Sequence, residues 1–468
     1  MKTIHQQTKA VAIFLAFFLS GAISHAQDIT GQWSGVLSVQ GMKMRIVFHI
    51  QKTEDGYKST MDSPDQGAIG LPVTNTEFDG SKISLTASNL GLLYEGELKT
   101  DSIAGVLKQS GMTIPLNLKK TNDEVKPLNR PQEPKPPFPY RSEDLTFENK
   151  DAGVTLAGTL TMPETGSNFT AVILISGSGA QDRNEELMGH KPFLVIADYL
   201  TRRGIAVLRY DDRGYAQSTG NFATATTADF ATDAENAIAY LKTRKEINPH
   251  KIGLMGHSEG GVIAPMVAAR SNDVGFIVML AGSGLRGDVL LLLQEEAAYK
   301  LSGLSDEKVE KLIKINAKIF DRIVGTNELL SLQEISDFMT TLKDEIEDVA
   351  LEGMTADRYI QQFTVSLAYP WMQFFLRYDP ASALEKVKCP VLAVIGSKDF
   401  QVPAKENLDA ISAALKKTGN TKATVKEYPG LNHLFQECTT GSSAEYAIIE
   451  QTFSPEVLKD LGDWISKI

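Results

Sequence analysis

A glycine-rich motif at residues 256–261, GHSEGG, contains the side chain best suited to nucleophilic chemistry. It follows the apolar run 251–255 and opens a segment with helical spacing, so Ser258 is predicted to stand on a tight strand-to-helix turn. The glycines are needed there because neighbouring backbone segments approach too closely for a Cβ atom. The following helix N-terminus would favour developing negative charge. The alternative interpretation is a glycine-rich packing turn.

A serine nucleophile needs a histidine base, which a carboxylate normally orients. On this type of turn the order along the chain is serine, acid, histidine, and His433 alone follows a suitable acid. It lies in a loop after the strand-like segment 423–427. His257 adjoins the serine, but the sharp turn is expected to aim its side chain away. The other histidines after residue 26 lie in unsuitable places: His49, His190 and His250.

The acid is expected just past a late strand. Asp399 follows the apolar run 391–396 and precedes Pro403, which would open a helix, so it is predicted to hold His433 in its working tautomer. Asp379 precedes that strand and is better explained as a turn or cap residue.

An oxyanion hole needs two backbone N–H groups. We expect one from Glu259, directly after the nucleophile, and one from the loop 176–182, where Ser178 is the first choice and Gly179 the second. This loop lacks the Lys-Ser/Thr pair of a phosphate-binding loop. The charged stretch 211–213 could be a metal or acid–base cluster, but a structural turn with an internal Asp–Arg pair is favoured.

Apolar strand-like runs alternate with helical segments from about residue 143 onward, which predicts a mostly parallel, doubly wound sheet with helices on both faces. The alternation stops between residues 284 and 384, where helical spacing predicts an inserted cap over the pocket. The aromatic residues near the end of this insertion would line the pocket or form the core of the cap: Tyr369, Trp371, Phe374 and Phe375.

The first 142 residues divide into three parts. Residues 1–26 have two lysines, a short apolar run and Ser-His-Ala at the end, which predicts a cleaved signal peptide and hence a periplasmic or secreted protein; the alternative is an uncleaved anchor. Residues 27–122 contain short alternating strands and Asp-Gly turns, typical of a small all-β barrel or sandwich. Residues 123–142 are rich in proline and are predicted to form a semi-rigid linker.

The composition excludes several classes of protein. The chain has 468 residues and a net charge of −11, which argues against nucleic-acid binding. It has two cysteines and no clustered histidines, so neither a metal nor another cofactor is expected. The strand at 391–396 spans roughly 20 Å and would separate Cys389 from Cys438, so no disulfide is predicted between them.

Five motifs together resemble the serine esterases of the α/β-hydrolase superfamily, in particular two-domain exported bacterial esterases with an N-terminal β-domain. They are GSGAQDRN (177–184), YDDRGYAQSTG (210–220), GHSEGG (256–261), GSKDFQVP (396–403) and GLNHLFQ (430–436). The resemblance implies a Ser258–His433–Asp399 triad that cleaves small or medium acyl esters through an acyl-enzyme. SGSG replaces the common HGG-type oxyanion segment, which leaves the second donor open.

Two other functions stay open: a serine peptidase of the prolyl-oligopeptidase type and a non-catalytic binding protein on a hydrolase scaffold. The β-block is too short for a propeller of several blades, and no member of the expected triad is missing. For the β-domain three roles stay open, namely covering the pocket, binding a polymer or forming a homodimer.

Overall fold

The computed structural model describes residues 28–468 except 40–41, 67, 110–111, 123–128 and 350–353. The predicted signal peptide, residues 1–26, lies outside the described residues. The chain divides into two units, one formed mainly by residues up to 123 and the other mainly by residues from 124 onward.

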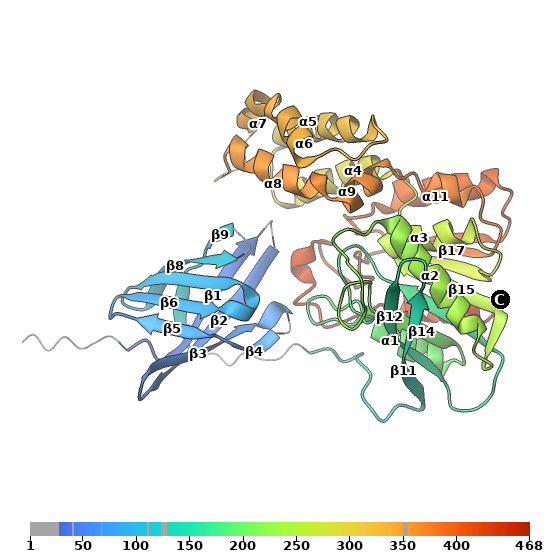
Figure 1. Cartoon of the computed structure of the whole chain (residues 1–468), viewed down its shortest axis with the longest axis horizontal. Helices are drawn as coiled ribbons and strands as arrows, with labels where there is room; N and C mark the ends of the chain where they lie inside the picture. The colour runs from blue at the N-terminus through green and yellow to red at the C-terminus, as the bar shows by residue number, and fades with distance from the viewer. Residues whose placement is uncertain (1–27, 40–41, 67, 110–111, 123–128, 350–353) are drawn as a thin grey trace, which may run out of the picture. The chain divides into compact units, whose positions relative to one another are not determined.

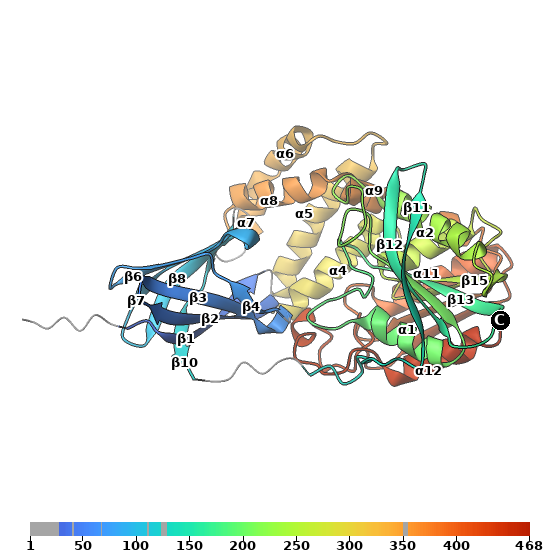
Figure 2. The ribbon, with the colours of Figure 1, turned by 60° about the horizontal axis from the view of Figure 1, so that its bottom comes forward.

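The N-terminal unit is a single curled sheet with the strand order β4-β3-β2-β1-β10-β8-β7-β6-β5, and β9 pairs with β8 (Figure 2). The pairs described are antiparallel, and the curl brings Thr76 of β5 within hydrogen-bond distance of Ser59 of β3, with 2.9 Å between the hydroxyl oxygens. The predicted antiparallel β-domain is confirmed, in the form of a half-barrel. Its strands are β1 (Gly31–Val39), β2 (Met42–Thr53), β3 (Gly56–Ser63), β4 (Ala68–Pro72), β5 (Asn75–Phe78), β6 (Lys82–Ala87), β7 (Leu92–Leu98), β8 (Ser102–Gln109), β9 (Met112–Pro115) and β10 (Leu118–Thr121).

The C-terminal unit contains an eight-stranded sheet with the order β11-β12-β14-β13-β15-β16-β17-β18. The β11–β12 and β12–β14 pairs are antiparallel and the other pairs are parallel, as predicted for an α/β-hydrolase. Strand β11 begins at Tyr140, so the last residues assigned to the linker belong to the sheet. The strands are β11 (Tyr140–Asn149), β12 (Val154–Pro163), β13 (Phe169–Ile175), β14 (Ala206–Tyr210), β15 (Ile247–His257), β16 (Phe276–Leu280), β17 (Val391–Gly396) and β18 (Ala423–Tyr428).

Helices cover both faces of this sheet because its parallel strands are apolar on both sides (Figure 1). Helices α2 (Thr227–Lys242), α3 (Glu259–Ala268) and α11 (Ala404–Lys417) pack in one hydrophobic cluster. Helices α1 (Pro192–Arg202) and α12 (Pro455–Ile465) pack in the cluster on the other face. The sheet is thereby held rigidly, and the loops at the carboxyl ends of its strands have fixed positions.

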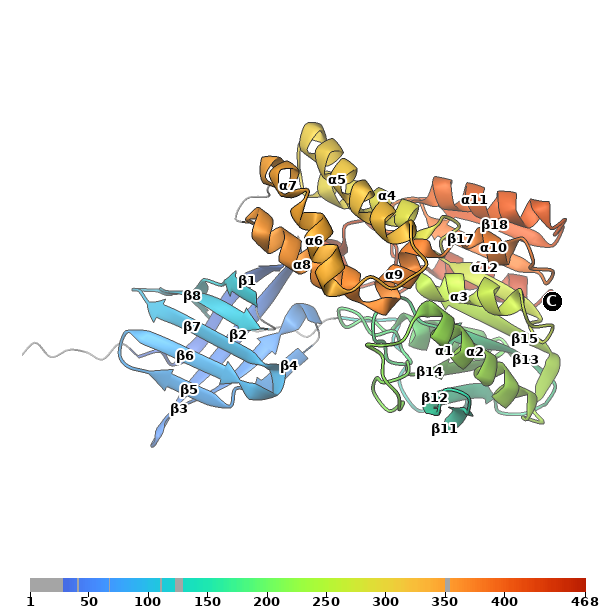
Figure 3. The ribbon, with the colours of Figure 1, turned by 45° about the horizontal axis from the view of Figure 1, so that its top comes forward.

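The predicted insertion is helical and lies between β16 and β17. Helices α5 to α8 form a hydrophobic cluster of their own, while α4 and α9 also pack toward the sheet, where α9 contacts α2 (Figure 3). The helices are α4 (Gly287–Leu301), α5 (Asp306–Val324), α6 (Leu332–Thr340), α7 (Lys343–Val349), α8 (Ala356–Ala368), α9 (Pro370–Arg377) and the short α10 (Ala381–Leu384).

Part of the proline-rich segment is hydrogen-bonded to loops of the C-terminal unit. The Arg130 guanidinium donates hydrogen bonds to the carbonyl oxygens of Met188, Ala447 and Ile449. The Gln132 carboxamide donates to the Phe453 carbonyl and accepts from two backbone N–H groups of the same loop. The linker prediction overlooked these polar side chains because the prolines dominate the pattern.

Candidate active site

Ser258 occupies a strained turn between β15 and α3. Its φ of 51° and ψ of −113° lie in the left-handed half of conformational space, which a non-glycine residue adopts at a cost. A Cβ on Gly256 would stand 1.9 Å from the Gly260 backbone, and one on Gly260 would stand 2.1 Å from the Ile175 carbonyl oxygen. The predicted close approach of neighbouring backbone segments therefore explains these glycines, and the Ser258 amide anchors the turn on the Leu280 carbonyl.

His433 and Asp399 form a buried pair at the ends of neighbouring strands. His433 Nδ1 lies 2.7 Å from Asp399 Oδ2, and neither side chain is more than 5% exposed. The other Asp399 oxygen accepts hydrogen bonds from the backbone N–H groups of Gln401 and Val402. Because both oxygens of Asp399 accept hydrogen bonds, the carboxylate holds one orientation and fixes the tautomer of His433 with its proton on Nδ1.

The loop that carries His433 is held by a buried asparagine that sequence reasoning did not single out. Asn432 Oδ1 accepts from the N–H groups of Leu434 and Gln436, and its amide donates to the Gln436 side chain.

The competing acid, Asp379, caps the turn before α10 by accepting from the Ala381 N–H, as predicted. His190 is fully buried and bonded to Thr452 and to the Tyr446 carbonyl, and burial lowers its pKa to about 4.

The side chain of His257 is buried beside His433 and is not aimed away from the site, contrary to the prediction. Its Nδ1 lies 2.9 Å from Glu185 Oε1, and its Nε2 lies 3.0 Å from the His433 carbonyl oxygen. The two imidazole rings are 4.7 Å apart. No sequence pattern singles out Glu185, which lies 72 residues from His257 along the chain.

The loop after β13 presents backbone donors to the site. The Gly177 N–H is occupied by Glu185 Oε1 at 2.7 Å. The structure gives no acceptor for the Ser178 N–H among the described residues, and Ser178 lines the same cavity as Ser258 and Glu259. Glu259 is the first residue of α3, where a backbone N–H has no partner within its helix. The residues of both predicted donors therefore line the cavity that Ser258 also lines.

A cavity of about 210 Å³ adjoins Ser258. We call the residues from the loops at the sheet edge its floor; they include Ser178, Ser258, Glu259 and Val402. We call the residues from the inserted helices its roof; they are Gly287, Leu290, Leu291 and Gln294 of α4 and Trp371, Met372 and Phe375 of α9. Of the four aromatic residues proposed from the sequence, Trp371 and Phe375 line the cavity, whereas Tyr369 is half exposed and Phe374 stacks on Tyr378.

One polar contact joins the roof to the floor. Glu259 Oε1 accepts hydrogen bonds from the Trp371 indole N–H and the Thr227 hydroxyl, each at 2.7 Å. Burial raises the pKa of Glu259, and the two hydrogen bonds offset part of that rise because they favour the carboxylate. The cap therefore contacts the residue that directly follows the nucleophile.

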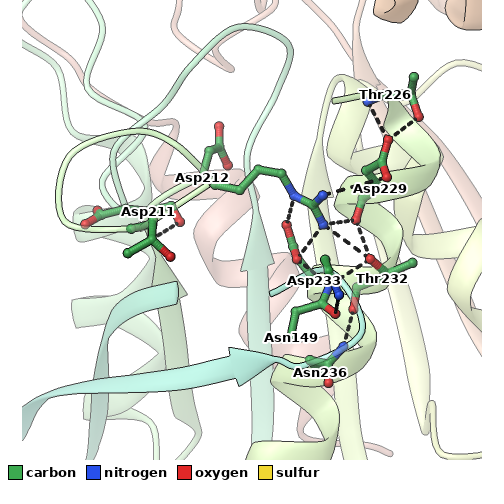
Figure 4. Close-up of polar contacts among 12 residues, drawn as sticks. Asn149, Asp211, Asp212, Thr226, Asp229, Thr232, Asp233 and Asn236 are labelled. Carbon is green, nitrogen blue, oxygen red and sulfur yellow. Dashed lines mark hydrogen bonds and ion pairs between the residues drawn. The ribbon is translucent and has the colours of Figure 1, made fainter. Parts of the chain in front are cut away.

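The predicted Asp–Arg pair within the turn 211–213 is not formed. Asp211 binds Arg183, and Asp212 accepts from the Ser176 hydroxyl and the Gln181 N–H, so both carboxylates support the loop after β13. Arg213 instead binds Asp233 of α2 at 2.6 Å, in a network that includes Asp229 and Thr232 (Figure 4). The error arose because the true partners are distant in sequence.

Among the residues that the structure describes, no group of three or more His, Cys, Asp or Glu side chains is arranged to hold a metal. Over the same residues, no helix combines the length and apolar character that a membrane crossing requires. Cys389 and Cys438 are both free thiols.

The family described as "Serine aminopeptidase, S33" has a sequence model that matches residues 191–437, just over half of the chain. The chain belongs to this family. Its members are hydrolases of the serine type, and the matched residues include Ser258, Asp399 and His433. The family assignment agrees with the sheet order and confirms the α/β-hydrolase prediction.

Comparison with individual proteins adds further similarities. Esterase EstD of Thermotoga maritima is 24% identical over 324 residues, which are 69% of this S33 chain and 68% of that protein. An uncharacterised 31.7 kDa protein of Escherichia coli is 27% identical over 275 residues, 58% of this chain and 84% of its own. Among solved structures, the esterase Pf2001 of Pyrococcus furiosus is 15% identical, covers 73% of this chain and 97% of its own, and has a TM-score of 0.43.

Proposed function

We propose that this S33 hydrolase cleaves carboxylic esters of small or medium acyl groups, with Ser258 as nucleophile, His433 as base and Asp399 as the residue that orients the base. The observation that carries the proposal is the coincidence of a strained serine, a buried histidine–carboxylate pair and an apolar cavity at one sheet edge. The relative named as an esterase supports the same reaction.

The proposed reaction proceeds in two steps. His433 Nε2 takes the proton of Ser258 as its Oγ attacks the ester carbonyl, and the oxyanion accepts hydrogen bonds from the Glu259 and Ser178 N–H groups. When the C–O bond breaks, His433 returns the proton to the leaving alcohol. A water molecule then gives a proton to His433 as it attacks the acyl-enzyme, and His433 returns that proton to Ser258 Oγ when the bond to the serine breaks and the acid leaves. Asp399 stabilises the imidazolium in both steps.

The family description makes a serine peptidase the second candidate. An aminopeptidase must hold the ammonium group of its substrate, which calls for an available carboxylate. Among the residues that line the cavity, Glu259 is the acid, and its Oε1 already accepts two hydrogen bonds. Burial also raises its pKa and so disfavours the charged form. These observations favour a neutral ester over a peptide with a free amino group.

The test compares p-nitrophenyl acetate, butyrate and octanoate with alanine and leucine p-nitroanilides, using the purified chain. We expect ester hydrolysis to exceed anilide hydrolysis and Ser258→Ala to abolish it. Ser283→Ala is the matched control because Ser283 lines the same cavity and its hydroxyl is bonded to Asn407. Equal ester rates for the wild type and Ser258→Ala would exclude the mechanism, and faster anilide cleavage would favour the peptidase.

We also propose export of the chain, based on residues 1–26. Expression in a Gram-negative host should deliver the enzyme to the periplasm with Gln27 as its first residue, which mass spectrometry of the intact protein measures. A retained N-terminus in the membrane fraction would support the uncleaved anchor instead.

A further inference from the structure

A second histidine–carboxylate pair lies beside the proposed triad and has no assigned role in it. His257 and Glu185 are both buried, with side chains at most 9% exposed. Glu185 itself has a φ of 52°, a left-handed conformation that a glutamate adopts only when its surroundings impose it. A buried ionisable pair of this kind is costly unless every polar atom has a partner.

The hydrogen bonds determine where the protons of this pair lie. His257 Nε2 faces the His433 carbonyl oxygen, which only accepts, so Nε2 carries a proton. Glu185 Oε1 lies against His257 Nδ1 and already accepts from the Gly177 N–H. One further proton must therefore lie between Nδ1 and Oε1. Without that proton, two acceptors would face each other at 2.9 Å and repel.

These contacts connect the three loops that form the proposed catalytic centre. Glu185 binds the loop that carries Ser178, and His257 directly precedes Ser258. The His433 carbonyl belongs to the loop that carries the proposed base. The packing is close, since a Cβ on Gly177 would lie 3.2 Å from both Glu185 Oε1 and Ser258 Cβ. A shift of any one loop would therefore strain or break the shared contact.

We propose that Glu185 and His257 are positioning residues. The proton that they share holds the loop of Ser178 and the loop of His433 against the turn that carries Ser258. The inference rests on the proposed function, since it assigns the pair to the same reaction. Loss of this proton in alkaline solution breaks the contact between His257 and Glu185 and lowers the turnover number, whereas substrate binding in the cavity changes little.

The electrostatic surroundings agree with a proton that is retained at neutral pH. Burial by itself opposes a charged imidazole, but the Glu185 carboxylate and the hydrogen bonds outweigh it, and the pKa of His257 lies above its ordinary value. The other ionisable groups near His257 are Asp399, which also raises its pKa, and the His433 ring. A pair with a raised pKa is intact at lower pH and is lost as the pH rises through that value.

The experiment measures the rate at which a fluorophosphonate probe labels Ser258, together with kcat and KM on p-nitrophenyl butyrate, from pH 5 to 10. For His257→Phe and Glu185→Ala we expect labelling and kcat to fall by about 10- to 100-fold, with KM within about threefold, because small misplacements of reacting groups have effects of this size. The wild-type rate should fall at alkaline pH.

Glu185→Gln provides a conservative variant that can keep the contact to His257 without the titrating proton, while the amide nitrogen at that position no longer accepts from the Gly177 N–H. Its amide can donate to Nδ1 of a neutral His257, so we expect partial rescue relative to Glu185→Ala and no alkaline fall. His250→Phe, an exposed histidine on the same strand, is the control. Melting temperatures identify any variant that fails to fold, and Glu185→Gln then supplies the pH comparison.

The outcomes separate this inference from the proposed function. A wild type that labels but does not cleave esters would refute the substrate class and still allow the variants to be compared. Labelling of folded His257→Phe and Glu185→Ala at the wild-type rate would overturn the positioning role. An unchanged alkaline fall in Glu185→Gln would also overturn it, because the shared proton would then not be its cause.

Discussion

The floor and the roof of the cavity are built by different physical means. Floor residues stand in short loops at the ends of β13, β15 and β17, and these loops are held by the buried pairs Glu185–His257 and Asp399–His433. The roof consists of side chains on α4 and α9, which are mostly apolar and meet the floor through the Trp371–Glu259 contact.

This difference separates reaction rate from selectivity. Directional hydrogen bonds position reacting atoms, so changes in the floor should slow all substrates alike. Apolar packing fixes only volume and shape, so changes in the roof should redistribute preference among substrates. Substitutions in the floor and in the roof can test this difference, and those that affect the floor should change kcat more.

The largest effect is expected from Asp399→Asn. The amide would favour the wrong tautomer of His433 and remove the charge that stabilises its imidazolium, so we expect kcat on every p-nitrophenyl ester to fall by about 10³- to 10⁴-fold. Steady-state kinetics across the acetate, butyrate and octanoate series measures it. A loss that differs strongly among the three esters would contradict the role of Asp399 as the residue that orients His433.

A smaller loss is expected when the second oxyanion donor is removed. Ser178→Pro lacks the backbone N–H, and deletion of one such donor typically lowers kcat by about 10²-fold. Ser178→Ala keeps the N–H and is the matched control, so its kcat should stay within about threefold of the wild type. If Ser178→Ala is as slow as Ser178→Pro, the hydroxyl rather than the amide carries the role.

The predictable parts of the site are those in which strand, turn and helix signals follow one another along the chain. Ser258 follows strand β15 directly and Asp399 follows strand β17 after a two-residue turn, so their positions could be predicted from the local pattern. The Glu185–His257 contact and the Trp371–Glu259 contact join residues 72 and 112 positions apart, and they depend on how three loops and an inserted helix pack. The Arg213–Asp233 pair was mistaken for a local one for the same reason.

Selectivity should respond to Phe375→Ala in the roof. Phe375 lines the cavity and stacks on Trp371 with ring centres 5.4 Å apart, so its removal enlarges the apolar space. We expect the ratio of kcat/KM for octanoate over butyrate to rise by about tenfold, within the range for a few methylene groups. Phe374→Ala, on the same helix but outside the cavity, should leave this ratio unchanged. A uniform loss on all esters would instead place Phe375 with the floor.

The smallest effect, and the one that links the two regions, is expected from Trp371→Phe. This variant removes one donor to Glu259 while it keeps an aromatic ring, so the chain should lose about 1–2 kcal/mol of stability, because the buried carboxyl group keeps only one of the two hydrogen bonds to its Oε1. Trp464→Phe, which changes a tryptophan of α12 that packs on Phe276, controls for the loss of an indole.

The stability lost in Trp371→Phe should depend on pH. Burial raises the pKa of folded Glu259, so folding loses stability as the pH rises from the unfolded value toward the folded one. Without the Trp371 donor the folded pKa rises further, and the penalty at neutral pH grows. The difference in melting temperature between wild type and Trp371→Phe should therefore be larger at pH 7.5 than at pH 4.5. An equal difference at both values would mean that the indole stabilises the cap by packing alone, and the roof would then have no polar connection to the chemistry of the floor.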